Sequence, residues 1–378
     1  MEKEDKQNID FTFEQWQQLL NLIQDSENQL RFLRQYYNAF KIKNEFYFEE
    51  DEIKKFPAKA TKSNVLKIYE NFINKNAELI LKELLEKGEI YSKLIGGNES
   101  STDTITDKIE ELNRVGASTS YTLLMYLLSK KDKLYDDKTF ESVLDFIIKY
   151  YARRNVTDMP NTRDLDDINI EVIKKCEDDI ARGEKITLDS IMIFHLDNTK
   201  AKHAELLKFK EFLSGKIYSE NAGMTRYLLC KLGENQTKEI RNLWERDKKN
   251  KYVWTIEHIF PEGKNIPECW INSIANGNKE EAERIQQEYV HLIGNLTLSG
   301  YNSNLSNRSF EEKQNHTDKK GNKIGYQNGL SLNNLEFETE NEKTNLAKIE
   351  NWTKESIKSR TITMVEELLE IFKFKNEK

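Results

Sequence analysis

The sequence predicts a mainly helical protein, in which an all-helical N-terminal body precedes a smaller domain that contains two short strands. Of the 378 residues, 37% are hydrophobic and 10% aromatic, which is enough apolar surface to fold. Only 4 prolines and 15 glycines occur, too few for a turn-rich all-β protein. Apolar residues recur at helical spacing over most of the first 215 positions. We therefore expect a helical body over 1–220 and a second domain over 221–378.

In the body, the apolar spacing predicts a helical hairpin over 13–40, with a break near Asp25 and Ser26, where a cap can start the second helix. A long helix follows from Ser63, and Gly88 is its expected C-terminal stop. Residues 123–128 are apolar nearly all round and should lie at the centre of the core. The same periodicity predicts helices at 140–151, 168–180 and 206–212.

After Gly223 the apolar residues come in short β-leaning runs, at 252–256 and 291–298. A charged helical segment, 279–289, lies between them, and a Ser- or Asn-capped helix over 303–314 follows. The order is therefore strand, strand, helix. The amphipathic stretch 349–372 predicts a closing helix that packs back on the body.

The charge and cysteine content limit the partners. With 58 Lys+Arg against 65 Asp+Glu the net charge is -7, so the total charge indicates no polyanion partner. The three cysteines form no CxxC pair, which favours a reducing cytoplasm over a disulfide framework. The N-terminus lacks an apolar signal segment, and no apolar run approaches the roughly 18 residues that span a bilayer. We expect a cytoplasmic protein with no membrane partner.

Four residues of the second domain form a candidate catalytic group. Glu257 and His258 end the first β-leaning run, so that a carboxylate and an imidazole are expected side by side. Asn295 lies within the second run, and Asn302 opens the following helix. Glu257 and an Asn amide oxygen are hard ligands suited to Mg²⁺ or Mn²⁺, and His258 could deprotonate a water. Asn295 could hold the imidazole in its orientation.

These residues carry a family resemblance. EHI-x-P, then GNLTL, then YNS-x-LSN-x-SFEEK resembles the ββα-metal motif of HNH nucleases, in the variant at the C-terminus of GmrSD-type, modification-dependent (type IV) restriction endonucleases. The resemblance continues upstream in LLMYLLSKK, YYARRNVTDMPNT and TRYLLCKL, and downstream in Trp352, Ile357 and Arg360, so it covers roughly residues 10–372.

The resemblance implies an HNH endonuclease that cleaves double-stranded, possibly modified, DNA with Mg²⁺ or Mn²⁺ in defence against phage. By similarity, Glu257 is the first metal ligand, His258 the general base, Asn295 the residue that supports this base, and Asn302 the distal metal ligand. Asn304 and Asn307 lie within reach of the same turn and are alternative distal ligands. His291, which begins the second run, is a weaker candidate for the site.

Full-length members of that family carry an N-terminal ParB-like nucleotide-hydrolysing domain with an Asp-Gly-Gln-Gln-Arg signature, which this sequence lacks. We therefore expect a sensor that is either separately encoded or missing. Two rival interpretations stay open: a phosphorothioation-dependent defence nickase, and a catalytically silent DNA-binding or scaffolding protein.

Several basic residues are candidates for phosphate contact. Residues 226–264 include nine Lys or Arg and six Asp or Glu, which gives a local positive excess beside the expected site. A helix face that is simply exposed to solvent would show the same excess. From this segment we select Lys248, Lys249 and Lys251. From the expected helix after the strands we select Arg308 and Lys313. For Arg153 and Arg154 we expect a structural role, in which they bind a helix terminus or a carboxylate, more than contact with DNA.

Overall fold

The computed structural model describes residues 13–41, 49–96, 104–134, 136–197, 201–235, 242–340, 342–375 and 377. It is mainly helical, as predicted, and it contains two small two-stranded sheets, one more than the single strand pair expected from the sequence. The chain divides into two compact units, the first comprising 1–151 and 158–203, and the second 152–157 and 204–378. The division after residue 203 precedes the expected boundary at 220.

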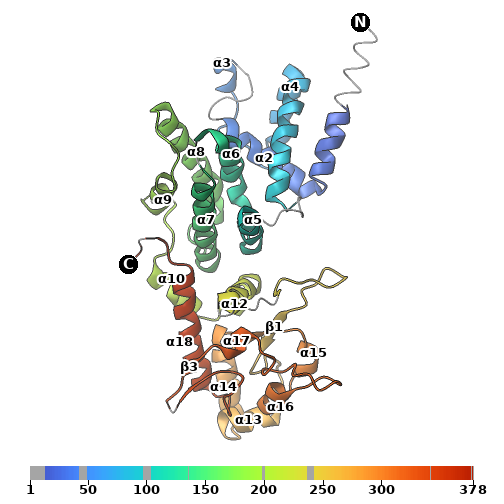
Figure 1. Ribbon diagram of the computed structural model, residues 1–378, viewed down its shortest axis with the longest axis vertical. Helices are drawn as coiled ribbons and strands as arrows, with labels where there is room; N and C mark the ends of the chain where they lie inside the picture. Colours follow the sequence, from blue (N-terminus) through green and yellow to red (C-terminus); the bar gives the residue numbers. More distant parts are fainter. Residues whose placement is uncertain are drawn as a thin grey trace. The chain divides into compact units, whose positions relative to one another are not determined.

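The first unit is built from helices. After a helical stretch at 13–22, its elements are α2 (Ser26–Phe40), α3 (Glu50–Ile53), α4 (Val65–Leu94), α5 (Thr104–Val115), η2 (Ser118–Ser120), α6 (Tyr121–Leu134), most of α7 (Asp137–Thr157), η3 (Thr162–Asp164), α8 (Leu165–Ala181) and α9 (Leu188–Asp197). Figure 1 shows α6 between α2 and α8, and α6 contacts both. Its residues 121–127 are buried, so the predicted central helix is confirmed.

Two local expectations in this unit have different outcomes. Asp25 caps α2 by accepting a hydrogen bond from the backbone N–H of Asn28, as the predicted hairpin break requires. Gly88 was expected to end the long helix, and this is wrong because α4 continues to Leu94. A Cβ at Gly88 would lie 2.6 Å from Leu19 Cδ1, so this glycine serves close helix packing instead.

The second unit holds both sheets. Its elements after the last turn of α7 are α10 (Leu206–Leu213), α11 (Ile217–Glu220), α12 (Ala222–Asn235), β1 (Thr255–His258), α13 (Glu268–Ala275), α14 (Lys279–Tyr289), η4 (Ile293–Asn295), β2 (Leu296–Ser299), α15 (Asn302–Leu305), α16 (Phe310–Asn315), α17 (Ser331–Asn334), β3 (Phe337–Glu338), β4 (Lys343–Thr344) and α18 (Lys354–Ile371). The strand, strand, helix order is present. The first helical segment is short, because the chain leaves the helix at Ser306 and starts α16 with a capping box between Ser309 and Glu312.

The core of the second unit lies around the β1–β2 pair and the helices near it. Its largest members are aromatic: Phe260, Trp270, Tyr289, Phe310, Tyr326, Phe337 and Trp352. The closing helix α18 packs against η4 and α10, as the amphipathic pattern predicts. Gly294 in η4 allows this approach, since a Cβ there would collide with Thr361 and with the carbonyl oxygen of Ile357.

Arg153 ties the last turn of α7 to the end of α18. It is fully buried, and it donates hydrogen bonds to the Phe372 carbonyl oxygen at 2.8 Å and to Glu377 Oε1 at 2.8 Å. Phe372 is the C-cap residue of α18, so Arg153 binds both a helix terminus and a carboxylate. The predicted structural role of Arg153 is confirmed.

Among the described residues, no helix has both the length and the apolar character needed to cross a membrane.

Candidate functional site

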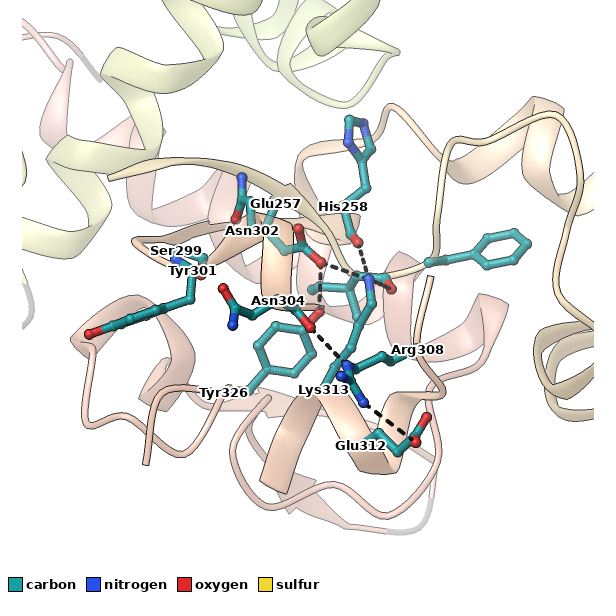
Figure 2. Close-up of polar contacts among 12 residues, drawn as sticks. Glu257, His258, Ser299, Tyr301, Asn302, Asn304, Arg308, Glu312, Lys313 and Tyr326 are labelled. Carbon is teal, nitrogen blue, oxygen red and sulfur yellow. Dashed lines mark hydrogen bonds and ion pairs between the residues drawn. The ribbon is translucent and has the colours of Figure 1, made fainter. Parts of the chain in front are cut away.

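β1 and β2 form the frame of the candidate site. The strands are antiparallel, with Glu257 opposite Thr297 and His258 opposite Leu296. Neighbouring residues on a strand point to opposite faces. Figure 2 shows the Glu257 carboxylate pointing toward the Lys313 ammonium and the His258 imidazole pointing away from it. The two groups are therefore adjacent along the chain but not side by side, which corrects the sequence-based expectation.

On one face, Glu257 is held in a buried polar network. Its Oε1 accepts hydrogen bonds from Lys313 Nζ at 2.6 Å and from the Tyr326 hydroxyl at 3.5 Å. Burial raises the pKa of the Glu257 carboxyl, and the Lys313 ammonium opposes that rise. Burial likewise lowers the pKa of Lys313, and Glu257 opposes this shift. The pair is stabilised by its mutual contact against the cost of removing both charges from water.

Lys313 does not lie where it was expected. It is 0% exposed, and besides Glu257 it donates to the backbone carbonyl oxygens of His258 at 2.8 Å and Ile259 at 3.1 Å. All three ammonium hydrogens thus have acceptors inside the protein. The expected contact of Lys313 with DNA is wrong for this structure, because the helix α16 turns this side chain inward, under the end of β1.

Asn302 is attached to the edge of β1. Its amide nitrogen donates to the Ile256 carbonyl oxygen at 2.7 Å and to the Thr255 hydroxyl at 2.7 Å. Its amide oxygen is buried and, among the described residues, has no hydrogen-bond partner. A buried carbonyl oxygen without a donor is costly unless a ligand satisfies it. By contrast, Asn304 and Asn307 are exposed.

Asn295 is fully buried, and its amide holds the chain after His258 rather than the imidazole. The amide nitrogen donates to the carbonyl oxygens of Phe260 and Val290, both at 3.0 Å. The amide oxygen accepts from the Phe260 backbone N–H at 2.9 Å and from Trp352 Nε1 at 3.1 Å. Asn295 therefore helps to fix the end of β1, because its amide binds the backbone of Phe260, two residues beyond His258.

Trp352 and Arg360, which belong to the downstream motif, hold the segment before β2 in place. Trp352 bonds the Asn295 amide, as described above. Arg360 is fully buried and donates to the carbonyl oxygens of Gly294 at 2.8 Å and Leu296 at 2.7 Å. Both side chains thus fix the segment that carries Asn295.

On the other face, the His258 imidazole lies among aromatic and charged groups. Tyr218 meets the His258 ring edge-on, with centroids 4.6 Å apart, and stacks on His291 with centroids 5.3 Å apart. His258 Nε2 is 3.5 Å from Glu262 Oε2 and forms no hydrogen bond among the described residues. Burial, followed by the nearby His291 and Lys313, lowers the pKa of His258 to about 3, so its imidazole is neutral at neutral pH.

Two groups of donors could hold a metal ion. One is the set from the sequence, Glu257 and Asn302, which offers oxygen atoms. The other is His258, Glu262 and His291, whose ligand atoms all lie within 4.8 Å of one another. In the sequence, Glu262 is one of the six acidic residues of 226–264, and His291 is only a weaker candidate for the site. The signal for Glu262 was its spacing four residues after His258, but only the fold brings His291 to the same place.

The other expected DNA-binding residues are exposed, unlike Lys313, but they do not lie on one helix face. Lys248, Lys249 and Lys251 are exposed, and they lie in a turn, not on a helix face. Asp247 organises this turn, since its carboxylate accepts the backbone N–H groups of Lys249 at 2.8 Å and Lys251 at 2.9 Å. Arg308 is exposed, with its Nε bonded to the Asn304 carbonyl oxygen.

Part of the basic segment is not available to DNA. Arg226 is buried, donates to the carbonyl oxygens of Leu243 and Trp254, and stacks on Tyr252. Lys238 and Arg241 lie outside the described residues. Because Arg226 is buried, the accessible positive charge of this segment is smaller than the sequence count implies.

Residues 205–367 match a family model described as GmrSD restriction endonucleases, C-terminal domain. The matched segment contains β1, β2, α15, α16 and nearly all of α18. The resemblance drawn from the sequence motifs is confirmed over these residues. No curated protein and no solved structure matches the chain.

Proposed function

Because residues 205–367 belong to the GmrSD restriction endonuclease C-terminal domain family, we propose that the protein is a metal-dependent HNH endonuclease of a restriction system. Its substrate is double-stranded DNA, and its reaction is hydrolysis of a phosphodiester bond. β1, β2 and the helices α15 and α16 are the ββα frame of this proposal.

The observation that carries the proposal is the amide of Asn302. Two hydrogen bonds to β1 fix its nitrogen, and its buried oxygen has no hydrogen-bond partner in the part of the chain that the structure describes. A hard divalent cation takes this kind of donor. Within the described residues the hydrogen bonds of Glu257 involve Oε1, so Oε2 would be the carboxylate oxygen that holds the ion.

Glu257 and Asn302 would hold Mg²⁺ or Mn²⁺, with the remaining positions taken by water and a phosphate oxygen. When bound, such an ion neutralises charge that develops on the phosphate oxygens and the leaving group. Lys313 supports this arrangement from inside the protein. Its ammonium fixes Oε1 of Glu257 and, through the His258 carbonyl oxygen, the end of β1.

His258 is the proposed general base. Its Nε2 is neutral and free of hydrogen bonds among the described residues, so it can accept a proton from the attacking water. Asn295 is a positioning residue, because it holds the backbone of Phe260 and thereby the strand end that carries His258. Lys248, Lys249, Lys251 and Arg308 are the proposed phosphate contacts, which position DNA without reading its sequence.

Plasmid cleavage tests this function. With Mg²⁺ the protein should nick or cut supercoiled DNA, and EDTA should stop the reaction. His258→Ala should lower the rate by about 10²-fold to 10⁴-fold while DNA affinity stays within a few-fold, because a general base acts mainly in the transition state. His316→Ala is the matched control, since His316 is a half-buried histidine outside the site. DNA binding without cleavage by the wild-type protein would instead support the silent scaffold.

A further inference from the structure

His258, Glu262 and His291 come together from two separate segments of the second unit. His258 ends β1, Glu262 lies in the loop that follows, and His291 lies in the turn between α14 and η4. Their ligand atoms all lie within 4.8 Å of one another. Two imidazoles and one carboxylate form a donor set that suits Zn²⁺ and related transition metals better than Mg²⁺, which prefers oxygen ligands.

The distances between these ligand atoms are close to those expected around a bound Zn²⁺ ion. Zn–N and Zn–O bonds of about 2.0–2.2 Å place two ligands of a tetrahedral ion about 3.4 Å apart. His258 Nε2 and Glu262 Oε2 are already 3.5 Å apart. The remaining distances, none above 4.8 Å, must close by up to about 1.4 Å, which side-chain rotation of the half-buried His291 and the exposed Glu262 can supply.

A second observation points to a ligand at this place. His258 is 9% exposed, and its Nε2 is buried without a hydrogen-bond partner among the described residues. Nδ1 of His291 is also buried without one. Tyr218 contacts both rings, edge-on to His258 and stacked on His291. The imidazoles are thus held near each other with unused nitrogen atoms.

We propose that His258, Glu262 and His291 form a second metal site, selective for transition-metal ions of the Zn²⁺ class, and that occupation of this site inhibits the nuclease. Zn²⁺ at Nε2 takes the lone pair with which His258 would accept a proton. The inhibitory part of this inference rests on the proposed function, and the binding part does not. Because Glu257 and His258 point to opposite faces of β1, the two metal sites use separate donors.

Zn²⁺ binding tests the site directly. The 378-residue protein in excess Mg²⁺ competes for Zn²⁺ with a chromophoric chelator, and the affinity is compared among wild type, His291→Gln, Glu262→Gln and the control His316→Gln. Loss of a ligand should weaken Zn²⁺ binding by at least about tenfold in the first two variants, whereas the control should bind as wild type does. Equal Zn²⁺ affinity in wild type and His291→Gln, or no binding by wild type, would overturn the site.

Cleavage assays test the inhibition. Zn²⁺ should inhibit Mg²⁺-dependent cleavage, and the inhibiting concentration should rise in His291→Gln by the same factor as the loss of affinity. Added Mg²⁺ should not relieve the inhibition. Relief by Mg²⁺ would show that Zn²⁺ displaces the catalytic ion and would overturn the proposal. If wild type binds Zn²⁺ but never cleaves DNA, the proposed function fails and the metal site stands.

Discussion

Lys313 Nζ lies 2.6 Å from Glu257 Oε1, with the lysine side chain 1% exposed and the glutamate side chain 8% exposed. A lysine from α16 thereby joins a carboxylate on β1 beneath the candidate catalytic histidine. A buried ion pair contributes little more to the free energy of unfolding than a well-packed apolar pair does. Removal of one partner, however, leaves a buried charge uncompensated.

Lys313→Met should therefore lower the free energy of unfolding by about 3–5 kcal/mol, measured by denaturant titration of the second unit's tryptophan fluorescence. The double variant Lys313→Met with Glu257→Gln should recover part of that loss. Lys323→Met, at an exposed lysine, is the control and should change stability by less than about 0.5 kcal/mol. A loss below about 1 kcal/mol in Lys313→Met would show that the pair is not formed in solution.

Asn302→Ala should abolish Mg²⁺-dependent plasmid cleavage, because a sparse oxygen shell cannot easily lose a ligand. Asn304→Ala should cleave as wild type does, since the Asn304 side chain is exposed. The opposite pattern, with activity lost only in Asn304→Ala, would place the distal ligand two residues further along the chain.

Asn295→Ala should reduce stability and cleavage together. The substitution removes hydrogen bonds from the backbone of Phe260, the Val290 carbonyl oxygen and the indole of Trp352, and buried groups left unpaired cost about 1–3 kcal/mol each. Thermal unfolding and cleavage would both be measured. A variant with unchanged melting temperature but no cleavage would point to direct contact with the imidazole instead.

Replacement of Lys248, Lys249 and Lys251 together by Glu tests the DNA surface. If these side chains meet phosphates, each lost contact should reduce the magnitude of d log K/d log[salt] on duplex DNA by about 0.9. The matched control replaces Lys319, Lys320 and Lys323, which lie in a similar turn organised by Asp318. Equal effects of both triple variants at about 0.15 M salt would indicate a general charge effect, not a contact.

His195 makes the first unit sensitive to acid. It is 3% exposed, its Nδ1 lies 2.8 Å from the Ile191 carbonyl oxygen, and burial lowers its pKa from 6.5 to about 4. The unfolded chain thus binds a proton at a higher pH than the folded protein does. Stability present above pH 6.5 should fall by about 3 kcal/mol as the pH drops toward 4.

His195→Leu should remove that part of the pH dependence. The measurement is the difference in melting temperature between wild type and variant across this pH range. A difference that does not change with pH would mean that His195 is protonated in the folded protein.

The sequence alone determined the features that depend on local spacing. The 3.6-residue periodicity located the central helix α6 and the closing helix α18, and the Asp25 cap located the break before α2. The short motifs identified the resemblance to GmrSD restriction endonucleases, whose C-terminal domain model matches residues 205–367, and they supplied the candidate residues Glu257, His258, Asn295 and Asn302.

Tertiary structure alone decided which side chains meet, because contacts between segments far apart in the chain leave no periodic signal. Gly88 resembles a helix stop until the packing of Leu19 against it is known. Lys313 resembles a surface lysine, but α16 turns it toward Glu257. The convergence of His258 with His291 likewise depends on how β1 lies against its neighbours. The same holds for the Asn302 amide oxygen, which has no hydrogen-bond partner among the residues that the structure describes.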